Sequence, residues 1–523
     1  MLFKAVVLLA LTHKGMGMPA SPIPFSPAQA NGHPTACIMQ VIGNPGYHYV
    51  ICQTAPEGFY STAINQKDGL IYYGKLEDGK LVPGDDVVGE VDPEEAGIEL
   101  YQIESAKTAH ESCMKNDYCK WKIDNNGLSN GKPPDSEYSN LVVPFYFADH
   151  EDRKLDVEAL ETDVFNDDHI SVKDFFESQS YGKMKWKNTF TEPVIISKKE
   201  IDCADNVSGT SNKMKDCLEE VLSLLEDASP KDFDGVTFIH SGYGAEFGGR
   251  DEDLTYLDDR IWSHSWELDS KDYKGRYALI SGFYGASNAR YQHAGVAIHE
   301  IAQMLGAPTQ YGPEPGNGLG NYDVMASPFG FDGHLHNCGS LSAYSKVLLE
   351  WADVEEITEE GEYTIDSSDT SNKVYKISKG FPKNEYFLIE NRNGGGYDKG
   401  MRGLGLAIYH IDESANGLVG HPEDGENYPK NHYIVSLVQA DGRFDLEREE
   451  DQGDNGDLFR TGFVDGITPD GPLIDGKPTD EEYPNTKAYS GGKFKDTGIT
   501  IKDISVPGKT MTFTVSFGES SSS

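Results

Sequence analysis

The alternation of hydrophobic and polar positions divides the chain into regions with different secondary structure. Over residues 136–355, buried-strand runs such as NLVVPFYFAD alternate with amphipathic helical patterns such as SVKDFFESQSYGKMKW. Over residues 356–523, short strands such as EYFLIENRN follow one another, separated by Gly, Asp and Asn. We therefore expect an α+β domain followed by a β-rich, sandwich-like C-terminal domain.

Residues 289–307, with the sequence ARYQHAGVAIHEIAQMLGA, have the hydrophobic spacing of an α-helix. Gly306 is the expected terminator, because glycine readily adopts the left-handed conformation that ends helices. The same helix carries His299 and Glu300. The side chains that we expect to face the core are Val296, Ile298, Ile301, Ala302 and Leu305.

His299 and Glu300 stand in the order that opens an H-E-x-x-H zinc motif. In such a helix, histidines four residues apart bind one Zn²⁺, and the glutamate deprotonates a zinc-bound water whose pKa the metal lowers to about 7. Here Gln303 takes the second-histidine position, and Thr309, beyond Gly306, takes the third-ligand position. An amide oxygen and a hydroxyl are poor ligands for zinc, so Glu300 lacks an acidified water unless the metal is held in another way.

Several separate stretches resemble the immune inhibitor A family of secreted zinc metallopeptidases, whose site is built on H-E-x-x-H-x-x-G-x-x-D. The resemblance implies a metzincin-like metallopeptidase domain over 136–355, a propeptide-like region over 21–135 and a methionine turn in which Met325 lies beneath the metal. Carried over residue by residue, only His299 keeps a zinc-ligand identity and only Glu300 a catalytic one. The matching stretches are NLVVPFYFAD, SVKDFFESQSYGKMKW, RIWSHSW, GNYDVMASPFG, LSAYSKVLLEWADV, EYFLIENRNGGGYDKGMRGLGLAIYHID, QADGRFDLER and DGLIYYGKLEDGKLVPG.

The incomplete ligand set leaves two functions open. One is a pseudopeptidase whose cleft still binds polypeptide, and coordination chemistry favours this alternative. The other is an active zinc metallo-endopeptidase with a non-standard ligand set and Glu300 as general base. His334 and His336 could complete such a set, since they face one side if that segment is extended. Otherwise His299 is a buried histidine bonded to a backbone carbonyl.

The first residues have the pattern of a secretory signal peptide. Lys4 precedes an apolar run from Ala5 to Leu11, and small residues follow up to Ala20. No later stretch of about 18 apolar residues occurs, so we expect no membrane span. A signal peptide over 1–20 and a secreted, extracellular protein follow from this pattern. Farther on, GLIYYGKLEDGKLV predicts a hairpin with its turn at Glu77-Asp78-Gly79.

The seven cysteines agree with an oxidising compartment. Pairing of sequence neighbours leaves Cys338 over, but six cysteines permit about 15 connectivities, so the connectivity stays open. The sequon NVS at Asn206 could carry a glycan outside the cell. The neighbour pairs are Cys37 with Cys52, Cys113 with Cys119 and Cys203 with Cys217.

The formal net charge of −41 argues against binding to nucleic acid or to an anionic membrane, because both would repel the protein. Such acidity also suits Ca²⁺, which takes oxygen ligands from loops rich in Asp and Asn. The loop EREEDQGDNGDLFR provides such donors at short spacing, so it is a candidate calcium site, with a solvated acidic turn as the alternative. A structural module held by calcium is a third possible function. The candidate ligands are Asp451, Asp454, Asn455 and Asp457.

Overall fold

The chain is a mixed α+β protein in which strands outnumber helices, and the expected α+β class is thereby confirmed. The expected signal peptide, Cys37, the Cys113–Cys119 pair, His334 and His336 lie outside the described residues. Among the described residues, no helix combines the length and apolar character needed to cross a membrane. The computed structural model describes residues 38–44, 47–54, 58–65, 67–68, 70–77, 80–98, 137–251, 253–285, 290–311, 318–331, 337–415, 432–448 and 450–518.

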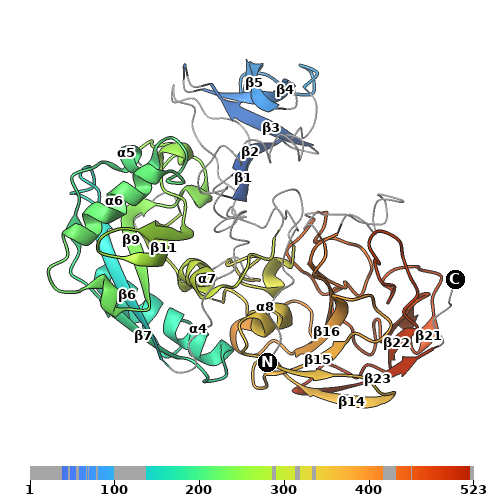
Figure 1. Cartoon of the computed structure of the whole chain (residues 1–523). Helices are drawn as coiled ribbons and strands as arrows, with labels where there is room; N and C mark the ends of the chain where they lie inside the picture. The colour runs from blue at the N-terminus through green and yellow to red at the C-terminus, as the bar shows by residue number, and fades with distance from the viewer. Residues whose placement is uncertain are drawn as a thin grey trace.

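An antiparallel sheet of five strands lies at the N-terminal end of the described chain (Figure 1). Glu77 pairs with Lys80, so the predicted hairpin is present. Apolar side chains of the sheet, Met39 and Tyr73 among them, form one buried cluster with Trp262 of the following domain. The N-terminal sheet is therefore anchored to that domain by a shared core. Its strands, in order, are β1 (Ile38–Asn44), β2 (Tyr47–Thr54), β3 (Gly58–Ile64), β4 (Ile71–Glu77) and β5 (Lys80–Val87).

A mostly parallel sheet forms the centre of the second domain. The strand order is β10-β11-β9-β6-β7, in which β6 runs parallel to both β7 and β9, β9 runs parallel to β11, and only the edge strand β10 is antiparallel. Two short strands, β8 and β12, pair with β6 and β11. The bounds are β6 (Glu137–Tyr146), β7 (Lys185–Phe190), β8 (Val194–Ile195), β9 (Gly235–Tyr243), β10 (His264–Asp269), β11 (Lys274–Tyr284) and β12 (Arg290–Tyr291).

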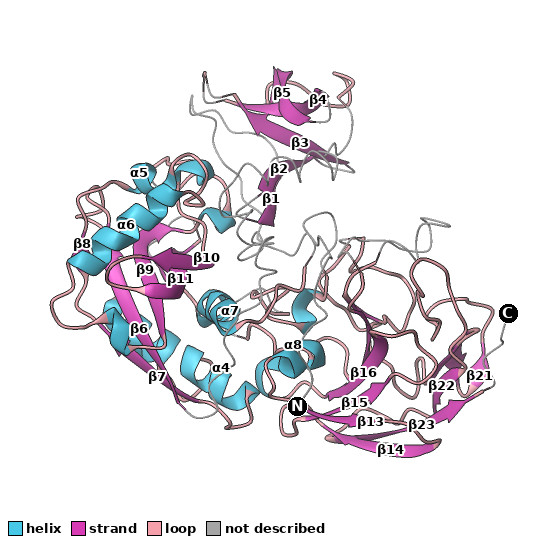
Figure 2. Ribbon diagram, in the orientation of Figure 1, coloured by secondary structure: helices cyan, strands magenta, loops and turns pink. Residues whose placement is uncertain are grey.

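Helices cover both faces of this sheet (Figure 2). Successive side chains of a strand point to opposite faces. Val142 of β6 accordingly joins the core under α4 and α7, whereas its neighbours Leu141 and Val143 join the core under α5 and α6. Serine side chains cap the N-termini of α4, α6 and α8. The helices are α3 (Val157–Ala159), which continues as a π-helix over Leu160–Phe165, α4 (Val172–Gln179), α5 (Glu200–Ala204), α6 (Asn212–Ser223), α7 (Ala294–Leu305) and α8 (Ala343–Leu348).

One of the three predicted disulfide pairs lies within the described residues. A disulfide joins Cys203 at the end of α5 to Cys217 in α6, which confirms that predicted pair. Cys52 is disulfide-bonded, and its partner lies outside the described residues. Cys338 is the free cysteine among the described ones, and it is buried.

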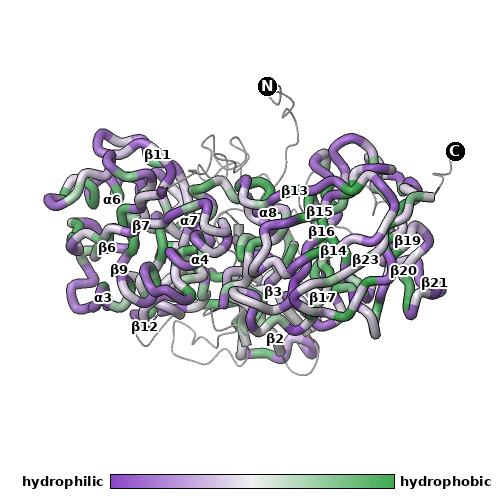
Figure 3. The backbone as a smooth tube through the Cα atoms, turned by 90° about the horizontal axis from the view of Figure 1, so that it is seen from below, coloured by the Kyte–Doolittle hydropathy of each residue, from purple (hydrophilic) through white to green (hydrophobic). Residues whose placement is uncertain are grey.

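Two sheets that share one hydrophobic core make up the C-terminal region. The first has the order β13-β15-β16-β17-β18 and the second the order β14-β23-β22-β19-β20-β21. Hydrophilic positions dominate the outer loops in the hydropathy view (Figure 3). The bounds are β13 (Asp353–Glu356), β14 (Gly361–Asp366), β15 (Lys373–Ile377), β16 (Glu385–Arg392), β17 (Gly405–Asp412), β18 (Val435–Leu437), β19 (Gly466–Thr468), β20 (Gly471–Ile474), β21 (Lys477–Pro478), β22 (Ile499–Lys502) and β23 (Thr510–Phe517).

Candidate functional site

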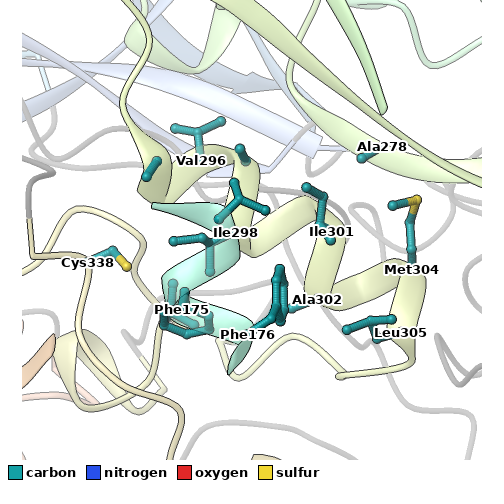
Figure 4. Close-up of a cluster of buried hydrophobic side chains, with 14 of the residues drawn as sticks. Phe175, Phe176, Ala278, Val296, Ile298, Ile301, Ala302, Met304, Leu305 and Cys338 are labelled. Atoms are coloured by element: carbon teal, nitrogen blue, oxygen red, sulfur yellow. The ribbon is translucent and has the colours of Figure 1, made fainter. Parts of the chain in front are cut away.

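Helix α7 is buried on all sides. Its apolar face packs against Phe175 and Phe176 of α4 (Figure 4) and includes all five side chains expected to face the core. The opposite face, which carries His299, Glu300 and Gln303, is buried as well. A helix with two buried faces requires partners for its polar side chains, and the surrounding segments supply some of them.

The helix ends where the sequence predicts but starts later. Gly306 has a φ of 102°, in the left-handed region that favours glycine, and it terminates α7. The predicted helix began at residue 289, whereas α7 begins at Ala294. The reason is that Arg290 and Tyr291 pair with β11 as strand β12, so tertiary pairing overrides the helical pattern there.

His299 is held by the loop that follows the helix. Its Nδ1 lies 2.8 Å from the backbone carbonyl oxygen of Val324. A carbonyl oxygen only accepts hydrogen bonds, so Nδ1 carries a proton, and whenever the ring is neutral the lone pair is on Nε2. This is the environment of a buried histidine bonded to a backbone carbonyl, and it is also the tautomer in which Nε2 can bind a metal. The ring of Tyr311 lies 6.4 Å from the imidazole, centroid to centroid.

Gln303 follows His299 by one helical turn. Residues four apart share a helix face, so the Gln303 amide lies where a second imidazole would stand in the complete motif. Its backbone carbonyl accepts a hydrogen bond from Nη1 of Arg276 at 3.1 Å, which ties the end of α7 to β11. Thr309 is half-buried in the segment after Gly306. The positions of two motif ligands are therefore occupied by an amide and a hydroxyl.

The predicted methionine turn packs directly against His299. Met325 is fully buried, and the residue before it supplies the carbonyl that binds the imidazole. The Met325 carbonyl in turn accepts a hydrogen bond from the backbone N–H of Gln310 at 2.8 Å. The turn thus links α7 to the segment that contains Thr309.

A buried aspartate fixes the shape of this turn. Oδ1 of Asp323 accepts a hydrogen bond from the Met325 backbone N–H at 2.8 Å, and Oδ2 accepts from the hydroxyls of Ser342 and Ser345 at 2.5 and 2.6 Å. Burial raises the pKa of Asp323, and these hydrogen bonds oppose the rise. The turn is therefore connected to the N-terminus of α8 as well as to α7.

The C-terminal region supports the turn through a buried ion pair. Arg392 of β16 donates from Nε and Nη2 to the two carboxylate oxygens of Asp398, both at 2.7 Å. Its Nη1 donates to the carbonyl oxygen of Tyr322, directly before Asp323, at 2.9 Å. Glu390 accepts a further bond from Nη1 at 3.1 Å. This network was not predicted from the sequence, because its members are scattered polar residues without a common motif.

The described residues around His299 do not fit a three-ligand zinc site. Ligand atoms of three His, Cys, Asp or Glu side chains converge among the described residues only at an acidic loop, which does not include His299. Cys338 packs on the first turn of α7, its Sγ donates to the carbonyl of Gly339, and burial raises its pKa. It is thus part of the core. The possible contribution of His334 and His336 stays a prediction, since both lie outside the described residues.

The acidic loop brings together a partly different set of carboxylates from the predicted one. Asp454 lies with Asp441 and Asp445 so that one ligand atom of each is within 4.8 Å of the others. Asp441 and Asp445 were not among the predicted calcium ligands. Their spacing within QADGRFD was the signal in the sequence that could have identified them. Burial, together with neighbouring carboxylates, raises the pKa of Asp445 to about 6. These are oxygen ligands of the kind that calcium takes, and calcium binding here stays a prediction.

The other predicted calcium ligands make hydrogen bonds within the loop and to Tyr322. Asp457 accepts from the Tyr322 hydroxyl at 2.9 Å and from the Asp454 backbone N–H at 2.7 Å. Oδ1 of Asp451 accepts from the backbone N–H of Gly453 at 2.8 Å. Asn455 receives two hydrogen bonds from Nη2 of Arg460, at its backbone carbonyl and at its side chain. The loop therefore contacts the methionine-turn segment through Tyr322.

The chain is similar to a distant relative among known proteins. No family model matches the chain. The chain is 27% identical over 179 residues to Immune inhibitor A from Bacillus thuringiensis subsp. alesti, in a match that covers 27% of this chain and 25% of that relative. The chain thus spans about a quarter of the length of the relative it matches. The comparison gives weak support to the immune inhibitor A family and hints at an ancestry among peptidases.

Proposed function

We propose that this protein is a secreted pseudopeptidase of the immune inhibitor A type, which binds polypeptide in a metzincin-like cleft and does not hydrolyse it. The observation that carries the proposal is the ligand set of α7. His299 is the imidazole on its buried polar face, while Gln303 stands one turn later and Thr309 follows Gly306. Zinc sites of hydrolytic enzymes use three protein ligands of higher affinity than an amide or a hydroxyl.

Two structural features support the metzincin-like arrangement. A helix that carries the H-E pair packs on a mostly parallel sheet, and a buried turn containing Met325 lies against the histidine of that pair. The distant similarity to Immune inhibitor A agrees with this ancestry. The turn and the hydrogen bonds of Asp323 that hold it do not involve a metal. We therefore expect the cleft to keep its shape without one.

The alternative is an active zinc endopeptidase with a non-standard ligand set. It is favoured by the Nδ1 bond of His299, which directs the lone pair to Nε2, and by Glu300 next in the chain. Such an enzyme needs further zinc ligands, and these must come from outside the described residues around His299. Glu300 would then serve as general base.

Restoring the missing ligands tests the assigned site. The double substitution Gln303→His and Thr309→Asp should raise zinc affinity at least about a hundredfold over the wild-type chain, because it supplies an imidazole and a carboxylate at motif positions. Adding His299→Ala to the restored protein is the matched control and should remove the gain. No increase in bound zinc, or an increase that persists without His299, would contradict the assignment.

Polypeptide binding is tested with the wild-type chain. Fluorescence anisotropy with labelled, unfolded casein should show saturable binding, while electrophoresis of the same sample should show intact casein after prolonged incubation. Saturable binding without fragments supports the pseudopeptidase. Fragments that disappear with Glu300→Ala would favour the enzyme instead, and absence of binding would refute both.

A further inference from the structure

A hollow lies in the C-terminal region, with an empty volume of about 470 Å³ when the open solvent at its mouth is included. None of the residues of α7 or of the methionine turn lines it. It is bounded by β17 and β18, by the loop that follows β18, and by the segment over residues 483–494. Neither the resemblance nor the proposed cleft explains it.

The walls of the hollow are aromatic. The ring of Tyr483 lies 5.7 Å from that of Phe444 and 6.3 Å from that of Phe494, and Phe494 lies 6.2 Å from Tyr489. Phe444, Tyr483 and Phe494 are only partly buried, so they offer apolar surface to the hollow. The four rings form a continuous aromatic lining.

The fourth ring, Tyr489, is held in a rigid stack. His410 and His432 stack on it with centroid distances of 4.1 and 3.8 Å. Two rings at such distances cannot share one face, so the histidines occupy opposite faces of Tyr489. Each imidazole is also bound to a carboxylate, His410 to Glu385 at 2.9 Å and His432 to Asp412 at 3.0 Å. The pocket is therefore preformed on this side.

The floor of the hollow is polar. His410 and Ser436 are paired across β17 and β18, and both line the hollow although each is more than nine-tenths buried. Nε2 of His410 donates to Glu385, since a carboxylate only accepts. In the part of the chain that the structure describes, Nδ1 of His410 and the Ser436 hydroxyl make no hydrogen bond. A ligand with polar groups could satisfy both.

Further polar groups surround the aromatic walls. Gln439 donates to the carboxylate of Glu447 at 2.6 Å, and burial raises the pKa of Glu447 to about 7. Asn485 and Lys487 also line the hollow. Lys487 forms no ion pair with any described residue. The hollow therefore combines aromatic surfaces with donors and acceptors at its floor and edge.

We propose that this hollow binds a single sugar ring, as a free glycoside or as one residue of a glycan. The C–H groups of a sugar ring carry partial positive charge and pack on the electron-rich faces of aromatic rings. Its hydroxyls donate and accept, as the His410 nitrogen and the Ser436 hydroxyl require. A purely apolar ligand would bury these two polar groups without partners, which is unfavourable.

Ligand-observed saturation-transfer NMR on the full-length protein tests the proposal with the methyl glycosides of glucose, galactose, mannose and N-acetylglucosamine. At least one should bind saturably. Phe494→Ala removes an aromatic wall and should weaken binding about tenfold or more, and Ser436→Ala, nearly isosteric, should weaken it about fivefold. Ile474→Ala, at a half-exposed position of β20 that does not line the hollow, should leave affinity unchanged.

Other outcomes would overturn the proposal. Binding of N-acetyltyrosinamide without binding of any glycoside would make the hollow a site for an aromatic side chain of a polypeptide. Glycoside binding that both pocket variants retain would place the site elsewhere, and no binding would exclude it. If Phe494→Ala unfolds, as circular dichroism would show, Ser436→Ala decides the question.

Discussion

The buried ion pair between Arg392 and Asp398 offers a quantitative test of how the C-terminal region supports the candidate site. Both side chains are almost completely excluded from solvent, and the arginine also donates to Glu390 and to the Tyr322 carbonyl. Replacing Arg392 with Met retains a long apolar side chain but leaves the buried Asp398 carboxylate without its cation, while Glu390 keeps Lys346 at 4.0 Å. We expect the methionine turn to lose its anchor.

The expected loss is large because the pair is buried. Removing one partner of such a pair costs about 3–5 kcal/mol, most of it from the unpaired charge that remains. Total stabilities of about 5–15 kcal/mol make this a substantial fraction. Arg392→Lys keeps a positive charge but cannot bind both Asp398 oxygens at once, so it should have a smaller effect.

Denaturant unfolding followed by tryptophan fluorescence measures the loss of stability, and hydrogen exchange locates it. Amides of Tyr322 and Met325 should exchange faster in Arg392→Met than in the wild-type chain. Lys274→Met is the matched control, because the ion pair of Lys274 with Asp269 is exposed and should contribute little. A loss below about 1 kcal/mol for Arg392→Met, or unchanged exchange at the turn, would show that the Arg392–Asp398 pair does not support the turn.

Three further predictions concern the rest of the molecule. Removing the Cys203–Cys217 disulfide by serine substitution should lower the unfolding free energy, measured by denaturant unfolding, by about 3 kcal/mol, the loop-closure value for roughly 15 residues; an unchanged unfolding free energy would contradict this. Burial raises the pKa of Asp457 to about 8, well above its value in an unfolded chain, so the folded form keeps a proton that the unfolded form releases. Raising the pH from 6 to 8 should therefore reduce stability, by up to about 3 kcal/mol, and the reduction should be smaller in Asp457→Asn, measured by thermal unfolding at both pH values. Trp262→Ala should loosen the N-terminal sheet, and limited proteolysis should then cleave between that sheet and β6 faster than in the wild-type chain; equal rates would contradict the shared core.

Local patterns in the sequence predicted the elements that carry the candidate site. The apolar runs at β6 and β9, the amphipathic pattern of α4 and the glycine at position 306 each reflect a short-range preference, and the structure follows them. The pairing of Cys203 with Cys217 followed from proximity along the chain. Such features depend on neighbours within one or two turns, so a single sequence contains the information.

Features made by distant segments were not predictable in this way. Periodicity assigned α7 one buried face, but the opposite face is buried as well, and only the fold brings Val324 to His299. Likewise, Asp454 meets Asp441 and Asp445 because the loop folds back on itself. The start of α7 was misplaced because pairing of Arg290 with β11 competes with helix formation. In each case a tertiary contact decides the outcome.

The zinc content of the purified wild-type protein tests the central claim most directly, with casein cleavage measured on the same preparation. We expect far less than one zinc per chain after dialysis against a zinc-containing buffer, and no cleavage above the background of Glu300→Ala. About one zinc per chain, together with cleavage that Glu300→Ala abolishes, would contradict it and establish an enzyme with an unusual ligand set.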